Sequence, residues 1–534
     1  MNRTISTLLI SVLAMGTAFS QSDEDRMNLA KLGNAYSAIT KLYVEKTDDK
    51  KVVEDAIRGM IEKLDPHSSY TNAEETRRMN EPLEGNFDGI GIQFNMLTDT
   101  LYVIQVISGG PSEKVGLMAG DRIIYVDDSL IAGVKKPNTE IMKMIRGKKG
   151  TEVRIRVKRG GSPELLDFKI IRDVIPVYSM DAAYMIDGKT GYMRLSRFAM
   201  SSIKEFEDAF GKLRKQGMQN LILDLQGNGG GFLHIACAIA DEFLGNDELI
   251  VYTQGRSQPR HDMNATRQGV FHDGKLVILV DEATASASEI VSGAVQDWDR
   301  GVTVGRRTFG KGLVQRPIML PDSSMIKLTV ARYYTPSGRN IQKPYEMGNS
   351  KAYNHDLIDR YNRGELMSAD SIHFPDSLKF GTLKSGRTVY GGGGIMPDVF
   401  VPIDSAKSTD YHMKLLRRGV INRTAMNYID GRRKEINRKY PNIKKFKENF
   451  TVDDGIIEDM KRFAEDEKIE FDEEQFAKSR DFISLQIKAL IARDIFDMSE
   501  YYMIMNDVNE VYNKAIEIIN DDGLYRRILS GSDM

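Results

Sequence analysis

Two stripes of apolar side chains at helical spacing occur near the start of the chain. The first is formed by Leu32, Tyr36, Ile39, Leu42 and Tyr43, and the second by Val52, Val53, Ala56, Ile57, Met60, Ile61 and Leu64. Apolar positions three and four residues apart are typical of an amphipathic helix, so the pattern predicts two helices. Asp65-Pro66-His67-Ser68 follows, and proline disfavours helix in the residue before it, so we expect the second helix to end there. Because two short helices bury little surface between them, we expect the pair to pack elsewhere or on another subunit.

Short strands and glycine turns replace this pattern between about residues 86 and 172. Residues 101–107 and 151–157 are rich in β-branched and other apolar side chains, which predicts strands. The sequence between these strands contains several glycines, which favour turns.

Strand and helix patterns alternate between about residues 174 and 403, as expected for an α/β domain. The apolar runs 220–225 and 275–280 predict buried strands, and a helix with one apolar face follows the second run. Residues 346–385 interrupt the alternation with polar, irregular sequence, which predicts an insertion or a surface loop. From about residue 406 onward the chain is charged and helical. We expect the apolar faces of these helices to pack internally, with partner binding as the alternative.

The composition excludes several classes of protein. In 534 residues, 74 Lys and Arg stand against 76 Asp and Glu, a formal net charge of −2. A nucleic-acid-binding protein normally carries a basic excess or a basic face, so we expect no nucleic-acid partner. Cys237 is the single cysteine, which excludes an internal disulfide and a Cys-rich metal site. The 7 His residues show no metal-ligand spacing.

Residues 1–20 have the three parts of a secretory signal. A positive charge precedes the short apolar run 8–15, and Ala18 and Ser20 are small residues at the two positions that a signal peptidase recognises. We therefore expect cleavage before Gln21 and a periplasmic or secreted protein. A membrane-spanning helix needs about 18 or more apolar residues, and the sequence contains no such run.

Residues 281–289 lie between a predicted buried strand and a predicted helix, where a side chain is presented at the end of a sheet. Small residues flank Ser286, which would let a peptide chain approach its hydroxyl. The backbone N–H of Ala287, at the helix start, points to where an oxyanion would form. The alternative is helix capping, because Ser and Glu before an apolar run are common N-terminal signals, and Ser288 suits that role.

Residues 305–315 contain a candidate general base. On a strand, Lys311 and Gln315 are four residues apart and face the same side, so the glutamine could orient the lysine. That role requires the pKa of the lysine to fall from about 10.4 to about 7–8, which burial against apolar walls can achieve. The segment also satisfies most of the phosphate-loop pattern of an NTPase. However, Gly312 stands where the Mg²⁺-binding Ser or Thr belongs.

Residues 224–231 form a glycine-rich turn directly after a predicted strand. Such a turn exposes backbone N–H groups, so Gly230 could supply a second oxyanion donor. A Ser-His-Asp arrangement would instead need a partner such as His234 near Ser286. The sequence has no G-x-S-x-G elbow, and His234 lies in an apolar stretch, so we expect a packed core histidine there.

Residues 108–124 resemble the bacterial PDZ domain, whose G-S-P-A-x-x-A-G-L-x-x-G-D-x-I segment they follow closely. The resemblance implies that the preceding loop receives a peptide carboxylate, and this loop consists of Gly89, Ile90, Gly91 and Ile92. Backbone N–H groups around glycines can bind a C-terminal carboxylate while the peptide adds to a sheet edge. Plain hairpin turns would explain the two glycines alone, but not the longer segment.

Taken together and in order, the three candidate segments resemble the carboxy-terminal processing (tail-specific) serine peptidases. The family's G-S-A-S-A-S-E, T-F-G-K-G-x-x-Q and D-L-R-x-N-x-G-G motifs align with residues 283–289, 308–315 and 224–231. The resemblance implies a nucleophile, a base, a residue that positions the base and an oxyanion glycine, which are Ser286, Lys311, Gln315 and Gly230 in that order. Further similar segments are 56–60, 64–68, 334–342 and 392–398, so the likeness covers roughly residues 30–400.

The chain departs from these motifs at two places. Ala283 and Thr284 replace Gly and Ser, which spares the nucleophile. Gln226 and Gly227 replace Arg and a usually polar residue, which changes how the oxyanion turn is held. The C-terminal helices resemble no part of the family pattern.

The resemblance implies a multidomain α+β fold, with a Clp protease/crotonase-like α/β peptidase core, a β-rich PDZ domain and helical N- and C-terminal regions. The expected divisions are 1–20 (signal peptide), 21–82 (N-terminal helices), 83–172 (PDZ domain), 173–405 (peptidase core, with 346–385 inserted) and 406–534 (C-terminal helices). The resemblance also implies that the PDZ domain gates the site and that the helical ends mediate homodimerisation.

The leading hypothesis is an exported serine endopeptidase that cleaves proteins near their C-terminal tails, after PDZ capture of the tail. Its expected partners are proteins or peptides with free C-terminal tails, and it needs no metal and no other cofactor. One alternative is an exported PDZ adaptor with a silent peptidase core, against which the intact Ser286, Lys311 and Gln315 argue. The other is an NTPase, against which Gly312 argues.

Overall fold

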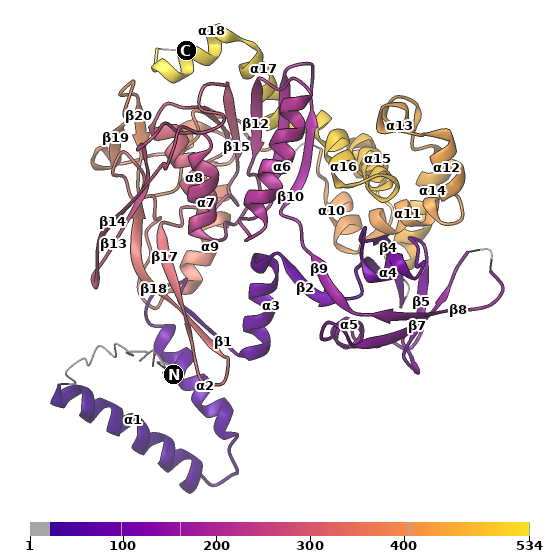
Figure 1. Cartoon of the computed structure of the whole chain (residues 1–534), viewed down its shortest axis with the longest axis horizontal. Helices are drawn as coiled ribbons and strands as arrows, with labels where there is room; N and C mark the ends of the chain where they lie inside the picture. Colours follow the sequence, from indigo (N-terminus) through magenta and orange to yellow (C-terminus); the bar gives the residue numbers. More distant parts are fainter. Residues whose placement is uncertain (1–21, 98, 161, 405–406, 533–534) are drawn as a thin grey trace, which may run out of the picture.

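The computed structural model describes residues 22–97, 99–160, 162–404 and 407–532 (Figure 1). The predicted signal segment 1–20 lies outside these residues. The described chain forms an N-terminal helical arm, two sheets of a central body, a separate β-rich unit and a group of C-terminal helices.

The N-terminal arm contains the two predicted helices, α1 (Asp23–Leu42) and α2 (Asp49–Ile61). Helix α1 has no buried residue and projects at the lower left of Figure 1. Helix α2 ends at Ile61, one turn before the proline loop that we expected to end it. The loop leads into β1 (Ser69–Thr71) and α3 (Ala73–Glu84), which connect the arm to the central body.

The β-rich unit is an antiparallel sheet in the order β3-β4-β5-β7-β8, with β6 paired to β5. Its strands are β3 (Ile92–Leu97), β4 (Thr100–Val106), β5 (Arg122–Val126), β6 (Ser129–Leu130), β7 (Glu152–Lys158) and β8 (Leu166–Ile171). Helices α4 (Pro111–Lys114) and α5 (Asn138–Ile145) complete the unit. It joins the central body through β2 (Asn86–Gly89) and β9 (Asp173–Pro176), which pair antiparallel, so two connections hold it rather than one.

The central body is built on a six-stranded sheet in the order β10-β11-β12-β15-β16-β21. All pairings except β10–β11 are parallel, and the strands are β10 (Met180–Met185), β11 (Thr190–Leu195), β12 (Asn220–Asp224), β15 (Leu276–Val280), β16 (Val302–Gly305) and β21 (Val399–Phe400). Every residue of the predicted strands β12 and β15 is buried, as expected when helices cover both faces of a parallel sheet.

Helices from different parts of the chain cover the two faces of the six-stranded sheet. One face packs on α6 (Ser202–Lys215), α7 (Leu233–Asp241) and α8 (Ala287–Asp297). The other packs on α17 (Glu510–Asn520) and α18 (Asp522–Ser530), whose apolar residues form one core with the strands. The last helices of the chain therefore complete the core of the central sheet.

A second sheet lies beside the first, in the order β1-β18-β13-β14 with β17 on the other side of β18. Its further strands are β13 (Leu249–Gly255), β14 (Gln258–Asn264), β17 (Leu313–Met319) and β18 (Met325–Tyr334). The next segment contains helix α9 (Ser350–Asn362), two 3-10 turns (Ala369–Ser371 and Asp376–Leu378) and the hairpin of β19 (Lys379–Gly381) and β20 (Thr388–Tyr390). Of the two predictions for 346–385, the surface loop was wrong for α9, because buried Tyr353 and Arg360 hold this helix against the body.

The remaining C-terminal helices have a core of their own. They are α10 (Asp410–Arg417), α11 (Val420–Ile429), α12 (Arg433–Lys439), α13 (Ile443–Asn449), α14 (Asp454–Asp466), α15 (Glu473–Ile495) and α16 (Met498–Met505), followed by the 3-10 turn Asn506–Val508. Within the described ranges no helix is long and apolar enough to cross a membrane.

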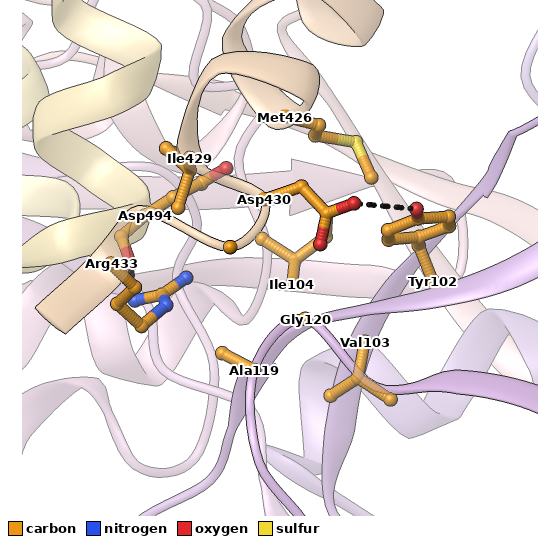
Figure 2. Close-up of a pocket in the computed structure, with 11 residues that line it drawn as sticks. Tyr102, Val103, Ile104, Ala119, Gly120, Met426, Ile429, Asp430, Arg433 and Asp494 are labelled. Carbon is orange, nitrogen blue, oxygen red and sulfur yellow. Dashed lines mark hydrogen bonds between the residues drawn. The ribbon is translucent and has the colours of Figure 1, made fainter. Parts of the chain in front are cut away.

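The β-rich unit packs against the C-terminal helices at α11. Met426 packs with Tyr102 and Ile104 of β4, and Asp430 accepts a hydrogen bond from Tyr102 (Figure 2). Asp430 also pairs with Arg122. Since Leu101 and Val103 face the unit's own core, β4 is buried on both faces. The C-terminal helices thus hold the β-rich unit on the side away from its core.

Candidate active site

Ser286 is held in an unusual backbone conformation at the junction of β15 and α8. It precedes the first residue of α8 and has φ of 58° and ψ of −116°. For a residue other than glycine, such a conformation costs about 1–3 kcal/mol and persists only where the surroundings enforce it. Ala287 is the first residue of α8, and the N–H groups of the first helical turn have no acceptor within the helix. The Ala287 N–H is therefore available next to the Ser286 side chain.

The buried carboxylate of Glu289 ties the Ser286 junction to the Lys311 segment. It accepts hydrogen bonds from the backbone N–H of Ser286 at 2.7 Å, of Gly310 at 2.8 Å and of Lys311 at 2.9 Å. The hydroxyl of Thr308 donates a further bond at 2.5 Å. Burial raises the pKa of Glu289, while these donors stabilise its charged form. Two segments distant in sequence are therefore fixed by one side chain.

Lys311 lies in a low-dielectric environment. Burial, and after it the positive charge of Lys327, lower the pKa of its amine to about 8. The backbone carbonyl of Lys311 accepts a hydrogen bond from the Tyr333 hydroxyl, which also lies 3.1 Å from the Ser286 carbonyl oxygen. At a pH near 8 a large fraction of the Lys311 amine is neutral, which is the state that a general base requires.

Gln315 lies on β17, but Lys311 does not, because this strand begins only at Leu313. The prediction of one strand through both residues was therefore wrong, although both side chains line the same pocket. The amide of Gln315 donates to the Leu313 carbonyl at 3.3 Å and to the Thr329 hydroxyl at 3.4 Å. That hydroxyl donates in turn to Asp65 at 2.9 Å, so the proline loop of the N-terminal arm supports the Gln315 side chain.

The glycine turn meets Ser286 at very short range. A Cβ atom on Gly230 would lie 2.8 Å from the Ser286 Cβ and 3.0 Å from the Ala287 nitrogen, and its φ is +102°. Only glycine fits this position without a shift. The Gly230 N–H donates a hydrogen bond to the Asn228 side-chain oxygen at 2.9 Å. To stabilise an oxyanion, this N–H must share the bond with the oxyanion or exchange it.

Gln226, one of the departures from the family motif, is held from two sides. Arg194 donates to its carbonyl at 2.7 Å, and Asn509 donates to its side chain at 3.1 Å. Gly227 donates to Asp281 at 3.0 Å. The turn is therefore fixed by strand β11 and by the C-terminal segment, in place of the missing arginine.

These groups surround one pocket of about 490 Å³. Five of its lining residues are the predicted Gly230, Ser286, Ala287, Lys311 and Gln315. The walls are largely apolar and include residues of α3, α7, α8 and β17, among them Met79, Leu83, Leu233, Ile290, Leu313 and Val314. Sequence analysis missed the contributions of α3, Lys327 and Tyr333. Helix α3 has only the pattern of an amphipathic helix in the sequence. Lys327 and Tyr333 lie on strand β18, and neither belongs to a motif.

Two sequence-based expectations near the pocket were wrong. His234 is exposed and lines the pocket beside the Phe232 ring, so it is not a core histidine. Its apolar neighbours face inward along α7 while it points outward. Ser288 does not cap α8, because Ser286 occupies the N-cap position and the buried Ser288 hydroxyl donates to the Asn228 carbonyl at 2.9 Å.

The phosphate-loop alternative meets a structural obstacle. A phosphate loop needs free backbone N–H groups, but those of Gly310 and Lys311 donate to Glu289. The N–H of Gly312 donates to the Gln342 side chain at 2.9 Å. The donors of the predicted loop are thus already used within the protein.

Profiles of known families match several parts of the chain. The Peptidase family S41 profile matches residues 189–347, the PDZ domain profile 89–170, and that of the activating protease CtpB N-terminal domain 10–76. Residues 411–497 match a family of unknown function. The Carboxy-terminal-processing protease of Bartonella bacilliformis is 36% identical over 342 residues, which cover 63% of this chain and 78% of that protein. The chain belongs to the carboxy-terminal processing proteases.

Other members of this family are also similar. Carboxy-terminal processing protease CtpA of Bacillus subtilis is 35% identical over 314 residues, covering 59% of this chain and 66% of that protein. The structure titled Photosystem II D1 C-terminal processing protease is 27% identical, with a TM-score of 0.33, and covers 60% of this chain and 91% of that one. As a carboxy-terminal processing protease of family S41, the chain is a serine-type peptidase that carries a PDZ domain, and the predicted α+β fold class is confirmed.

Proposed function

We propose that this carboxy-terminal processing protease is an exported endopeptidase whose nucleophile is Ser286 and whose general base is Lys311. The Lys311 amine removes the Ser286 proton as the hydroxyl oxygen attacks the peptide carbonyl. The N–H groups of Ala287 and Gly230 stabilise the resulting oxyanion. The Lys311 ammonium then protonates the leaving amine, which produces an acyl-enzyme. Water, deprotonated by Lys311, hydrolyses this ester and restores the serine hydroxyl.

The observation that carries this proposal is the convergence of a conformationally strained Ser286 and a half-buried Lys311 in one largely apolar pocket. Neither group is reactive in water at neutral pH, because serine needs a base and lysine is protonated. Burial supports the neutral amine, and Glu289 supports the backbone of both residues. In the proposed mechanism Gln315 positions the lysine side chain.

We further propose that the PDZ domain captures the C-terminal tail of the substrate at the segment Gly89, Ile90, Gly91 and Ile92. Strand β3 begins at Ile92 and lies at the edge of the described sheet, where an added peptide strand can pair with it. The first three of these residues are buried, so recognition would use their backbone rather than their side chains. Proteins with free C-terminal tails are the corresponding substrate class.

Export and homodimerisation are part of the same proposal. Residues 1–20 supply the predicted signal, and the mature protein would act in the periplasm or outside the cell. Helix α1 exposes a row of large apolar side chains, namely Met27, Leu29, Leu32, Tyr36, Ile39 and Leu42. A second copy of the arm would cover this row, as is usual for an apolar face of this kind.

The proposal is tested by comparing wild type with Ser286→Ala on an unfolded protein that has an apolar C-terminus. Mass spectrometry of the products should show cleavage by wild type and none by Ser286→Ala. Equal product formation by both proteins would exclude Ser286 as the nucleophile. Tail binding without cleavage by either would favour the adaptor alternative.

A further inference from the structure

Lys327 occupies the middle of the second sheet, next to the proposed dyad. On β18 it lies opposite Pro317 of β17 on one side and Ser69 of β1 on the other. Its side chain is half-buried and lines the same pocket as Ser286 and Lys311. The mechanism proposed above assigns it no role.

The ammonium of Lys327 has no ion-pair or hydrogen-bond partner among the described residues. By contrast, the buried ammonium of Lys343 is paired and lies 2.9 Å from Asp356. The described lining of the pocket includes no Asp or Glu. Burial lowers the pKa of Lys327, and its positive charge acts on Lys311 and on His67. A buried, unpaired cation is costly unless something else compensates it.

We infer that Lys327 is an anion-binding residue of the substrate pocket and takes a carboxylate of the bound peptide. The carboxylate has two sources, an Asp or Glu side chain or the terminal α-carboxylate of a short tail. A charge-assisted hydrogen bond to either would replace the water that the half-buried ammonium has lost. This inference rests on the proposed function only in taking this pocket as the peptide site.

The experiment measures peptide binding to the full-length Ser286→Ala protein, so that cleavage does not interfere. The first set of probes consists of acetylated, C-terminally amidated apolar decapeptides that carry one Glu, at a different position in each peptide. Each is compared with the peptide that has Gln at the same position. The second is the same apolar peptide with a free carboxylate against the amide. Each is measured with Lys327 intact and in the Lys327→Met and Lys327→Arg backgrounds. PDZ binding of a free carboxylate should be equal in all three backgrounds, because Lys327 lies outside the PDZ domain, so the change between backgrounds reports on Lys327.

With Lys327 intact, one carboxylate peptide should bind about tenfold more tightly than its neutral counterpart, beyond any PDZ contribution. Lys327→Met should reduce this gap to about twofold or less, and Lys327→Arg should keep most of it. A gap at one Glu position identifies the side-chain source, and a gap with the free carboxylate alone identifies the α-carboxylate. Lys204→Met, which removes an exposed lysine on α6, serves as the matched control and should keep the gap.

Equal binding of acidic and neutral peptides, or a gap that Lys327→Met leaves unchanged, would overturn the inference. If Lys327→Met does not fold, as judged by thermal unfolding, Lys327→Gln and Lys327→Arg carry the comparison. Cleavage by the Ser286-intact protein is scored separately. Absence of cleavage with a Lys327-dependent gap would refute the proposed function and leave this inference standing, whereas cleavage without the gap would do the reverse.

Discussion

The carboxylate of Glu289 accepts a hydrogen bond from the backbone N–H of Ser286 at 2.7 Å, three residues earlier on the same helix start. Because the same carboxylate also binds the Gly310 and Lys311 N–H groups, it sets the distance between the two halves of the proposed dyad. A helix-capping residue thus serves the site as well as the helix.

Glu289→Gln should reduce kcat by about tenfold or more and destabilise the fold by about 2–4 kcal/mol. The amide has one acceptor oxygen instead of two, so buried donors lose their partner. Peptidase kinetics and thermal unfolding would measure both effects. Glu282→Gln removes a carboxylate that pairs with Arg306 and provides the matched control. Unchanged kinetics in Glu289→Gln would show that the carboxylate does not position the dyad.

The kcat/KM of wild type should rise with pH and reach half of its plateau near pH 8. The base must be neutral to act, and burial has lowered the pKa of Lys311 to about 8, so protonation abolishes activity below that pH. Lys327→Met removes a neighbouring positive charge and should move the midpoint to higher pH. A pH profile on a neutral amidated peptide measures this. A flat profile between pH 6 and 9 would contradict Lys311 as the base.

Lys311→Arg should lower kcat by about 10³-fold or more at every pH. A guanidinium stays protonated and cannot accept the Ser286 proton. Burst kinetics with an activated ester substrate would show the loss of acylation. Thermal unfolding separates this effect from misfolding, and substantial activity in Lys311→Arg would refute the dyad.

Gly230→Ala should reduce kcat by about 10²–10³-fold. The new Cβ would lie 2.8 Å from the Ser286 Cβ, and a φ of +102° strains any other residue. Gly229→Ala adds the same methyl one residue earlier, where nothing lies within 4 Å, and should leave the unfolding temperature unchanged. A fully active Gly230→Ala would remove this turn from the proposed oxyanion site.

Tyr525→Phe should destabilise the protein by about 1–3 kcal/mol. The α18 hydroxyl accepts a hydrogen bond from the Leu276 N–H at 3.0 Å and lies 3.2 Å from its carbonyl, so its removal leaves buried strand groups unpaired. Urea unfolding would measure the loss. Tyr361→Phe, at an exposed hydroxyl of α9, should cost less than about 0.5 kcal/mol. Equal stability of the two variants would show that α18 contributes little to the core sheet.

Periodicity in the sequence was sufficient for an α/β domain and the main strands of its core, and local chemistry pointed to the segments around Ser286, Lys311 and Gly230. The fold class rested on the family resemblance. A nucleophile needs small neighbours, a tight turn needs glycine, and a buried strand needs a short apolar run, so each signal lies within a few consecutive residues. His234 shows the limit of this evidence, because an apolar stretch of helix still exposes one residue per turn.

Only the tertiary structure brought together groups that are distant along the chain. It placed Asp65 behind Gln315 through Thr329 and Asn509 beside Gln226. It also placed Lys327 in the pocket with no partner among the residues that the structure describes. It also showed that α17 and α18 close the second face of the core sheet. Periodicity shows which face of an element is apolar, but not which other element covers that face, because the pairing depends on packing across long sequence separations. The sequence alone therefore determined the candidate chemical groups of this peptidase, and the tertiary structure decided how they are supported and that Lys327 lies in the same pocket.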